Sequence, residues 1–142
     1  MSGSKAGISY PTWPDMRGEW IPSILFDPSY WKWSSFIAYD ENAFFPALIQ
    51  TFHRLTAYIL FFVGLWVGSR LWGKPSQIAR TAGLLIMSIL SLQVLLGIWT
   101  VVECRGIIPV GLGVAHQTTA VFLLTVVLWA LYLSRRAPRM VE

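Results

Sequence analysis

Two stretches of similar sequence decide the expected fold, Pro46-Ala-Leu-Ile-Gln-Thr-Phe-His53-Arg-Leu-Thr-Ala57 and Pro109-Val-Gly-Leu-Gly-Val-Ala-His116-Gln-Thr-Thr-Ala120. In each stretch a proline precedes a histidine by seven positions, and a Thr-Ala pair begins three positions after that histidine. Proline is tolerated in the first turn of a helix, where its missing N–H is not needed. Each histidine is therefore expected about two turns inside a helix, roughly 10 Å from its start at about 1.5 Å per residue.

Each stretch continues into a long apolar segment, and the composition indicates that these segments lie in a membrane. The chain has 142 residues, of which 55% are hydrophobic and only 13% charged, and this is too apolar for a soluble domain of its size. Three segments, at about 46–72, 78–102 and 109–134, exceed the ~20 residues that a bilayer requires. Only helices satisfy their backbone in lipid without closing a barrel. The expected fold class is an all-α integral membrane bundle of three transmembrane helices.

The region before these segments has a different character. Residues 1–45 are polar and rich in aromatic residues, proline and glycine, and Trp13–Pro22 has the composition of turns and short irregular pieces. Tryptophan prefers the membrane–water interface. We therefore expect two parts, an interfacial loop region on the outer side at 1–45 and a three-helix transmembrane domain at 46–142.

Basic residues lie at the ends of the apolar segments, which does not favour nucleic-acid binding and instead predicts an orientation. The first interhelical loop and the C-terminal tail carry Arg70, Lys74, Arg80, Arg135, Arg136 and Arg139. The N-terminal region carries the acids Asp15, Glu19, Asp27, Asp40 and Glu41 against the bases Lys5, Arg17 and Lys32. Loops rich in Lys and Arg stay on the cytoplasmic side. The N-terminal region is expected outside and the C-terminus on the cytoplasmic or matrix side, in a bacterial plasma membrane or a mitochondrial inner membrane.

This orientation requires a polar region of about 45 residues to cross the membrane without a visible signal. The N-terminus has no basic stretch followed by an apolar run. We therefore expect a further helix upstream, in a longer protein of which this chain is a part.

His53 and His116 are the only histidines of the chain. A titratable residue inside a membrane helix is costly to bury and is by default a functional hypothesis. Two imidazoles at matched depth on two parallel helices suit a b-type haem, one on each side of the iron, because imidazole binds metal through one nitrogen and donates a hydrogen bond from the other. The alternative is that each histidine hydrogen-bonds a neighbouring helix. Zinc is disfavoured because no third ligand is visible, and the single Cys104 excludes a cysteine-based metal site built by this chain alone.

Other polar residues in the apolar segments are candidates for cofactor binding. Arg54 adjoins His53 and is suited either to a haem propionate or to snorkelling toward the surface. Gln50, one turn before His53, and Gln117, next to His116, would bind the cofactor or another helix. Gln93 in the second segment is expected to form an interhelical hydrogen bond. Five glycines indicate close helix contacts or space for a macrocycle: Gly64, Gly68, Gly97, Gly111 and Gly113.

Four motifs in order carry a family resemblance. Thr12-Trp-Pro-Asp-Met-Arg-Gly-Glu-Trp-Ile-Pro22 precedes Gln50-Thr-Phe-His-Arg-Leu-Thr-Ala57, followed by Leu92-Gln-Val-Leu-Leu-Gly-Ile-Trp-Thr100 and Ala115-His-Gln-Thr-Thr-Ala120. Together they resemble the C-terminal half of heme A synthase, over nearly the whole chain.

The resemblance implies an enzyme of eight helices in two similar halves, which oxidises a methyl group of heme O to the formyl group of heme A for terminal oxidases. It implies that His53 and His116 are the axial ligands of haem b in the C-terminal half. The N-terminal half places a glutamate three residues before its first histidine, and here that position is Gln50. The implied partners are the lipid bilayer, an N-terminal half or another copy of the chain, and heme O as substrate of the assembled enzyme. The family half has four helices and only three are found here, so no catalytic residue is assigned.

Two other functions remain open from the residues alone. The first is a stand-alone b-type cytochrome subunit that carries electrons in a membrane complex. The second is a haem-free assembly protein that uses the same helices as interaction surfaces.

Overall fold

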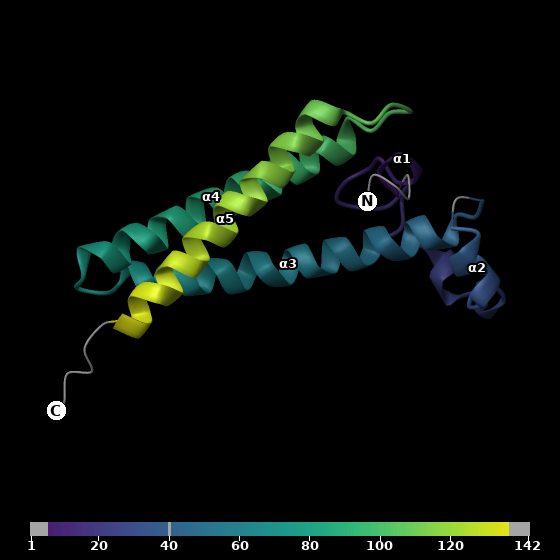
Figure 1. Cartoon of the computed structure of the whole chain (residues 1–142). Coiled ribbons are helices and arrows are strands. Elements are labelled where there is room, and N and C mark those ends of the chain that lie inside the picture. The colour runs from purple at the N-terminus through teal and green to yellow at the C-terminus, as the bar shows by residue number, and fades with distance from the viewer. Residues whose placement is uncertain (1–5, 40, 137–142) are drawn as a thin grey trace.

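The computed structural model describes residues 6–39 and 41–136, and its architecture is helical (Figure 1). Four short elements come first: α1 (Ala6–Ser9), η1 (Ser23–Phe26), η2 (Pro28–Tyr30) and α2 (Trp33–Ile37). Three long helices follow: α3 (Phe44–Trp72), α4 (Gln77–Val102) and α5 (Val110–Arg136). Lys5, Asp40 and Arg139, which entered the charge argument, lie outside the described residues.

The three long helices are long and apolar enough to cross a membrane, which confirms the expected fold class. Their ends reflect local chemistry. α3 begins before Pro46 because Oδ1 of Asn42 accepts hydrogen bonds from the N–H groups of Phe44 and Phe45, both at 3.1 Å. Ser76 caps α4 by accepting from the N–H of Ala79 at 3.5 Å. The helices thus begin and end within two residues of the predicted segments.

α4 packs against both of the other long helices, and it runs antiparallel to each (Figure 1). The contact with α3 is close because glycines face each other at Gly68 and Gly83. A Cβ atom at Gly83 would clash with the main-chain oxygen of Gly68 and lie 2.8 Å from the main-chain nitrogen of Trp72. Small residues allow such backbone approach in membrane helices. Because α4 is antiparallel to both of its neighbours, α3 and α5 run in the same direction.

Toward its N-terminal end α3 diverges from α4, and the segment containing α1 lies between α3 and the connection from α4 to α5 (Figure 1). Gly7 lies against Cys104 of that connection, where an added Cβ would be 3.1 Å from the sulfur. Met16 and Gln50 are fully buried on the α3 side of this segment. The N-terminal segment therefore joins two parts of the chain that are not adjacent in sequence.

Aromatic side chains surround the start of α3. The ring of Phe44, which is 0% exposed, packs edge-on against Trp31 and Phe36, with ring centroids 5.1 and 5.8 Å apart, and stacks on Tyr30 at 6.1 Å. Trp33 beside this cluster is 79% exposed. The expected loop region is thus built of short helical turns held by an aromatic core of its own.

Candidate functional site

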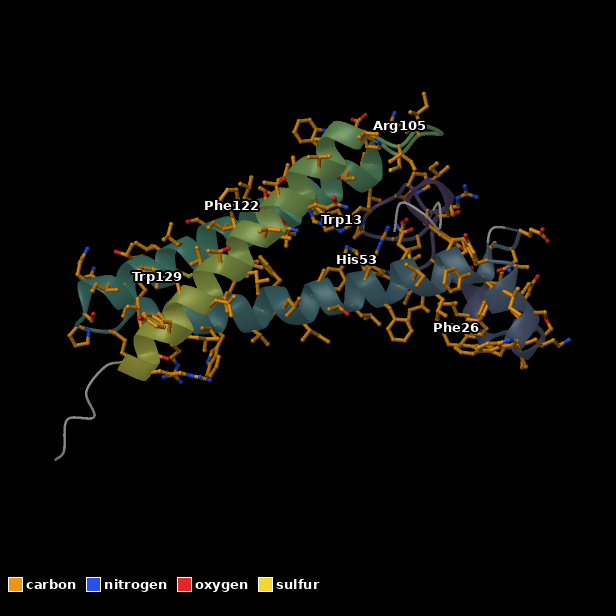
Figure 2. The ribbon with its side chains drawn as sticks, viewed as in Figure 1. Trp13, Phe26, His53, Arg105, Phe122 and Trp129 are labelled. Atoms are coloured by element: carbon orange, nitrogen blue, oxygen red, sulfur yellow. The ribbon has the colours of Figure 1, made fainter. Side chains whose placement is uncertain are left out.

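The structure brings the two histidines together from different helices. His53 lies on the side of α3 that faces α5, and its ring centroid is 6.4 Å from that of His116 (Figure 2). His53 is the tenth residue of α3 and His116 is the seventh of α5. The sequence predicted equal depths for the two histidines, and the observed depths differ by less than one helical turn. His53 is exposed and His116 is half-buried.

The separation of the two rings agrees with that of two ligands on one metal ion. With metal–nitrogen bonds of about 2.0–2.1 Å and a ring centre roughly 1.1 Å behind the bonding nitrogen, two imidazoles on opposite sides of a metal have centres roughly 6.2–6.4 Å apart. The observed 6.4 Å lies within this range. The planes are inclined by 70°, so the rings do not stack on each other. Two imidazole donors at this separation would therefore suit one haem iron held between His53 and His116.

Further metal ligands are not gathered at this place. Within 6–39 and 41–136 the structure contains no group of three or more His, Cys, Asp or Glu side chains that could hold a metal ion. A site that binds metal through His53 and His116 then depends on a ligand that fills the remaining positions itself. The four nitrogen atoms of a porphyrin do this.

His116 is held by α4, a helix without a histidine. Its Nδ1 is 3.1 Å from the main-chain oxygen of Gln93, and its Nε2 is 3.3 Å from the side-chain Nε2 of the same residue. Gly97, one turn further along α4, lies under the ring. The sequence had indicated an interhelical hydrogen bond for Gln93 but not that its partner would be a site histidine. Gly97, four residues after Gln93 on the same face of α4, was the one sequence feature that indicated a close contact at this place.

Gln50 contacts the N-terminal segment. It is 0% exposed, and its Nε2 donates to the main-chain oxygen of Tyr10 at 2.9 Å. Its Oε1 is buried and has no hydrogen-bond partner among the described groups. Burial also raises the pKa of the Tyr10 phenol.

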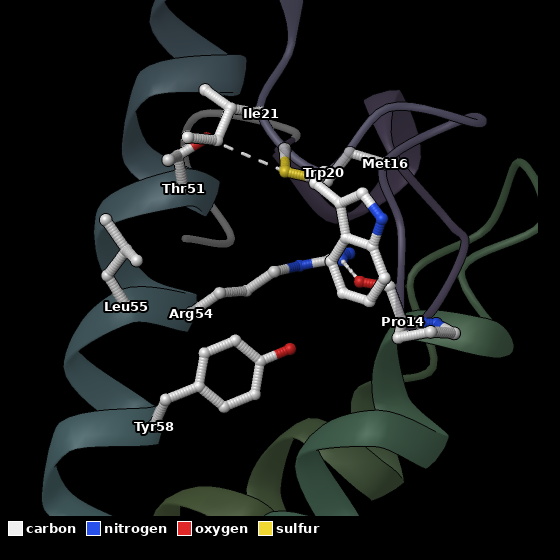
Figure 3. A pocket seen from close by; sticks show the side chains of 8 residues that line it. All are labelled: Pro14, Met16, Trp20, Ile21, Thr51, Arg54, Leu55 and Tyr58. Atoms are coloured by element: carbon white, nitrogen blue, oxygen red, sulfur yellow. Dashed lines mark hydrogen bonds between the residues drawn. The ribbon is translucent and has the colours of Figure 1, made fainter.

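Arg54 also faces the N-terminal segment. Its guanidinium donates to the main-chain oxygens of Thr12 (2.6 Å), Pro14 (3.1 Å) and Asp15 (2.8 Å), as Figure 3 shows in part. The chain reverses after Asp15, where Arg17 adopts a positive φ of 59°. The predicted alternatives for Arg54 were a propionate or the membrane surface. In the structure Arg54 donates to three main-chain carbonyls. The sequence carried no signal for these partners, because backbone carbonyls are present at every position.

A small cavity lies beside Arg54 (Figure 3). Its volume is about 40 Å³, which is room for a few water molecules and too little for a cofactor. The residues that line it are Pro14, Met16, Trp20, Ile21, Thr51, Arg54, Leu55 and Tyr58. The histidine pair, rather than this cavity, is therefore the candidate site. Gln117, the remaining predicted site residue, is exposed on α5.

Comparison with known proteins shows the family of the chain. The family model of the cytochrome oxidase assembly protein COX15-CtaA matches residues 1–128. The chain is 37% identical over 135 residues to the heme A synthase of Paracoccus denitrificans, covering 95% of this chain and 33% of that protein. It is 36% identical over 138 residues to that of Roseobacter denitrificans, covering 94% and 32%. It is 34% identical over 145 residues to that of Bradyrhizobium sp. strain BTAi1, covering 99% and 36%.

These matches extend over nearly the whole chain but not over the whole of the relatives. The chain spans about a third of the length of the curated relatives that it matches. No solved structure matches it. The family match and the identities confirm the resemblance that the four sequence motifs indicated, and the chain belongs to the COX15-CtaA family of cytochrome oxidase assembly proteins, whose relatives here are heme A synthases.

Proposed function

We propose that this chain is the haem-binding C-terminal part of a heme A synthase, with His53 and His116 as the axial ligands of a b-type haem. The observation that carries the proposal is the 6.4 Å separation of the two ring centroids, which belong to different helices, α3 and α5. The names of the relatives favour this function over a stand-alone cytochrome or a haem-free assembly protein.

The residues of this chain would hold the haem rather than react with its substrate. A haem iron with imidazoles in both axial positions has no open site for oxygen and is suited to electron transfer. His53 and His116 each bind through one ring nitrogen and remain neutral. Arg54 and Gln50, which flank His53 on α3, hold the N-terminal segment against this helix. The oxidation of heme O to heme A would take place in a further part of the assembled enzyme.

The same proposal includes an orientation. The connection between α3 and α4 carries Lys74 and is flanked by Arg70 and Arg80. This charge supports a cytoplasmic or matrix location for that end of the bundle and for the C-terminus. The N-terminal segment and the histidines would then lie toward the outer side.

The test is a reduced-minus-oxidised visible spectrum of the detergent-purified chain, expressed with ample haem, beside the variants H53A and H116A. We expect a sharp low-spin b-type spectrum in the parent and its loss, or conversion to high spin, in each variant. T125A is the matched control, because Thr125 is an exposed residue of α5 whose hydroxyl donates to the oxygen of Val121 one turn earlier. A parent without haem, or variants that keep the low-spin spectrum, would contradict the proposal.

A further inference from the structure

His116 contacts one turn of α4, and the proposed assignment of His116 as a haem ligand does not by itself account for this contact. The imidazole lies against one turn of α4, with Nδ1 3.1 Å from the main-chain oxygen of Gln93. Its Cε1 would be 3.0 Å, and its Nδ1 3.4 Å, from a Cβ atom placed on Gly97. A backbone carbonyl therefore holds the ring, and the ring fits beside α4 because Gly97 has no side chain.

This contact selects one form of the imidazole. A carbonyl oxygen only accepts hydrogen bonds, so Nδ1 must carry the proton and donate it to Gln93. In the neutral ring Nε2 then carries the lone pair, which is the group that binds a metal. The Nε2 atom of the Gln93 side chain, 3.3 Å from Nε2 of His116, is a donor and meets this lone pair, so both contacts agree on the same tautomer.

Gly97 makes the carbonyl of Gln93 accessible. In an α-helix the oxygen of residue 93 already accepts a bond from the N–H of residue 97, so a second donor must approach it from the side. A Cβ on residue 97 would occupy the place where the ring of His116 makes this approach. Any larger residue would have to move the imidazole by a few tenths of an ångström or more, which lengthens the hydrogen bond.

We propose that the main-chain carbonyl of Gln93 and the bare backbone at Gly97 are positioning groups for His116, which set its tautomer and raise its strength as a metal ligand. This inference rests on the proposed function of His116. A ligating histidine that donates its second N–H becomes a more basic ligand, and partners of this kind change metal affinity by about 10- to 100-fold. A more basic axial ligand stabilises the oxidised iron and lowers the midpoint potential.

The side chain of Gln93 differs from its main-chain carbonyl in its relation to His116. The single lone pair on Nε2 of His116 cannot accept from the amide and bind a metal at the same time. The Gln93 side chain is therefore dispensable for ligation, while its carbonyl is not. Oε1 of the Gln93 side chain is buried without a hydrogen-bond partner among the described groups. Replacing Gln93 with leucine therefore removes no hydrogen bond of this oxygen.

The experiment measures haem retention and the midpoint potential of the purified haem-bound chain and its variants. G97A, and more strongly G97V, should raise the midpoint potential and weaken haem retention by up to about 10- to 100-fold. Q93L keeps the carbonyl and should retain the low-spin spectrum and the parent potential. G64A is the control for helix packing, because a Cβ there meets the flexible end of Leu90 on α4 and not a histidine.

The outcomes separate the inference from the proposed function. A parent without a low-spin haem overturns both. A parent with haem whose G97A and G97V variants behave like G64A overturns the positioning role alone, as does loss of the spectrum in Q93L with G97A unchanged. The positioning role is supported if the midpoint potential rises in G97A and G97V and stays at the parent value in Q93L and G64A.

A second measurement applies even where the Gly97 variants do not accumulate. The H116A variant is supplied with imidazole or with 1-methylimidazole, which lacks the N–H that donates to Gln93. Imidazole should restore the low-spin spectrum with the parent potential, and 1-methylimidazole should bind more weakly and give a higher potential. Equal rescue by the two compounds, or none by imidazole, would overturn the inference.

Discussion

The guanidinium of Arg54 offers a direct test of how the N-terminal segment is held at the site. The substitution R54M keeps most of the length of the side chain and removes its donors. It would leave the main-chain oxygens of Thr12, Pro14 and Asp15 without the bonds that they accept at 2.6, 3.1 and 2.8 Å. Because these three oxygens lie within four consecutive residues, their release should free the turn as a unit.

The size of the effect follows from these contacts. A hydrogen bond from a charged donor contributes about 1.5–3 kcal/mol, so the three together have an upper limit of roughly 5–9 kcal/mol. Arg54 is only half-buried and the released oxygens regain water, so we expect a loss of about 2–4 kcal/mol. At about 1.4 kcal/mol per tenfold change, the detached state becomes roughly 30- to 700-fold more populated.

Amide hydrogen exchange measured by mass spectrometry in nanodiscs would report this opening. Three amides of the turn are bonded within the segment: Met16 to the oxygen of Glu19 at 2.7 Å, Arg17 to Oγ1 of Thr12 at 2.7 Å, and Gly18 to Oδ1 of Asp15 at 3.1 Å. Their protection should fall in R54M by the factor given above and recover only in part in R54K, because an ammonium cannot span three separate acceptors.

Two controls make the result specific. The amide of Ser29, which bonds Oδ1 of Asp27 at 2.8 Å, belongs to η2 and should keep its exchange rate. R105Q removes an exposed cation whose Nε bonds only the oxygen of Val102 at 3.3 Å, and it should leave the turn unchanged. Unchanged exchange of the turn in R54M, or an equal change in R105Q, would refute the reasoning.

Two further predictions concern packing and the single thiol. G83A should lower the stability of the purified chain by about 1–3 kcal/mol, because the new methyl group meets the backbone of Gly68 and Trp72. The thermal midpoint in detergent measures this loss, and G113A is the control because a Cβ there meets nothing within 4 Å. Equal midpoints of the two variants would contradict the prediction. Cys104 is buried, and burial raises the pKa of its thiol, so the reactive thiolate fraction at pH 8 is below that of a free cysteine. Its alkylation should therefore be slower in the folded chain than after denaturation and should accelerate as pH rises, and equal rates in the two states would contradict this.

The spans were predictable from the sequence because crossing a bilayer imposes a length and an apolar composition on a single continuous segment. The meeting of His53 and His116 was also predictable in outline. Matched contexts on the first and third segments put both residues at similar depth, and the antiparallel helix between them makes those two segments parallel. The start of α3 was predicted two residues late, because Oδ1 of Asn42 accepts from the N–H groups of Phe44 and Phe45 and Pro46 occupies a later position of the first turn.

The sequence by itself therefore determined a membrane protein of three helices, the two histidines and the family. The tertiary structure decided what each polar side chain binds. Gln50 and Arg54 engage backbone oxygens about 40 residues away, and His116 engages the backbone of Gln93 across an interface that Gly97 opens. Main-chain carbonyls are the same at every position of a sequence, so their choice as partners depends on which segments the fold places side by side.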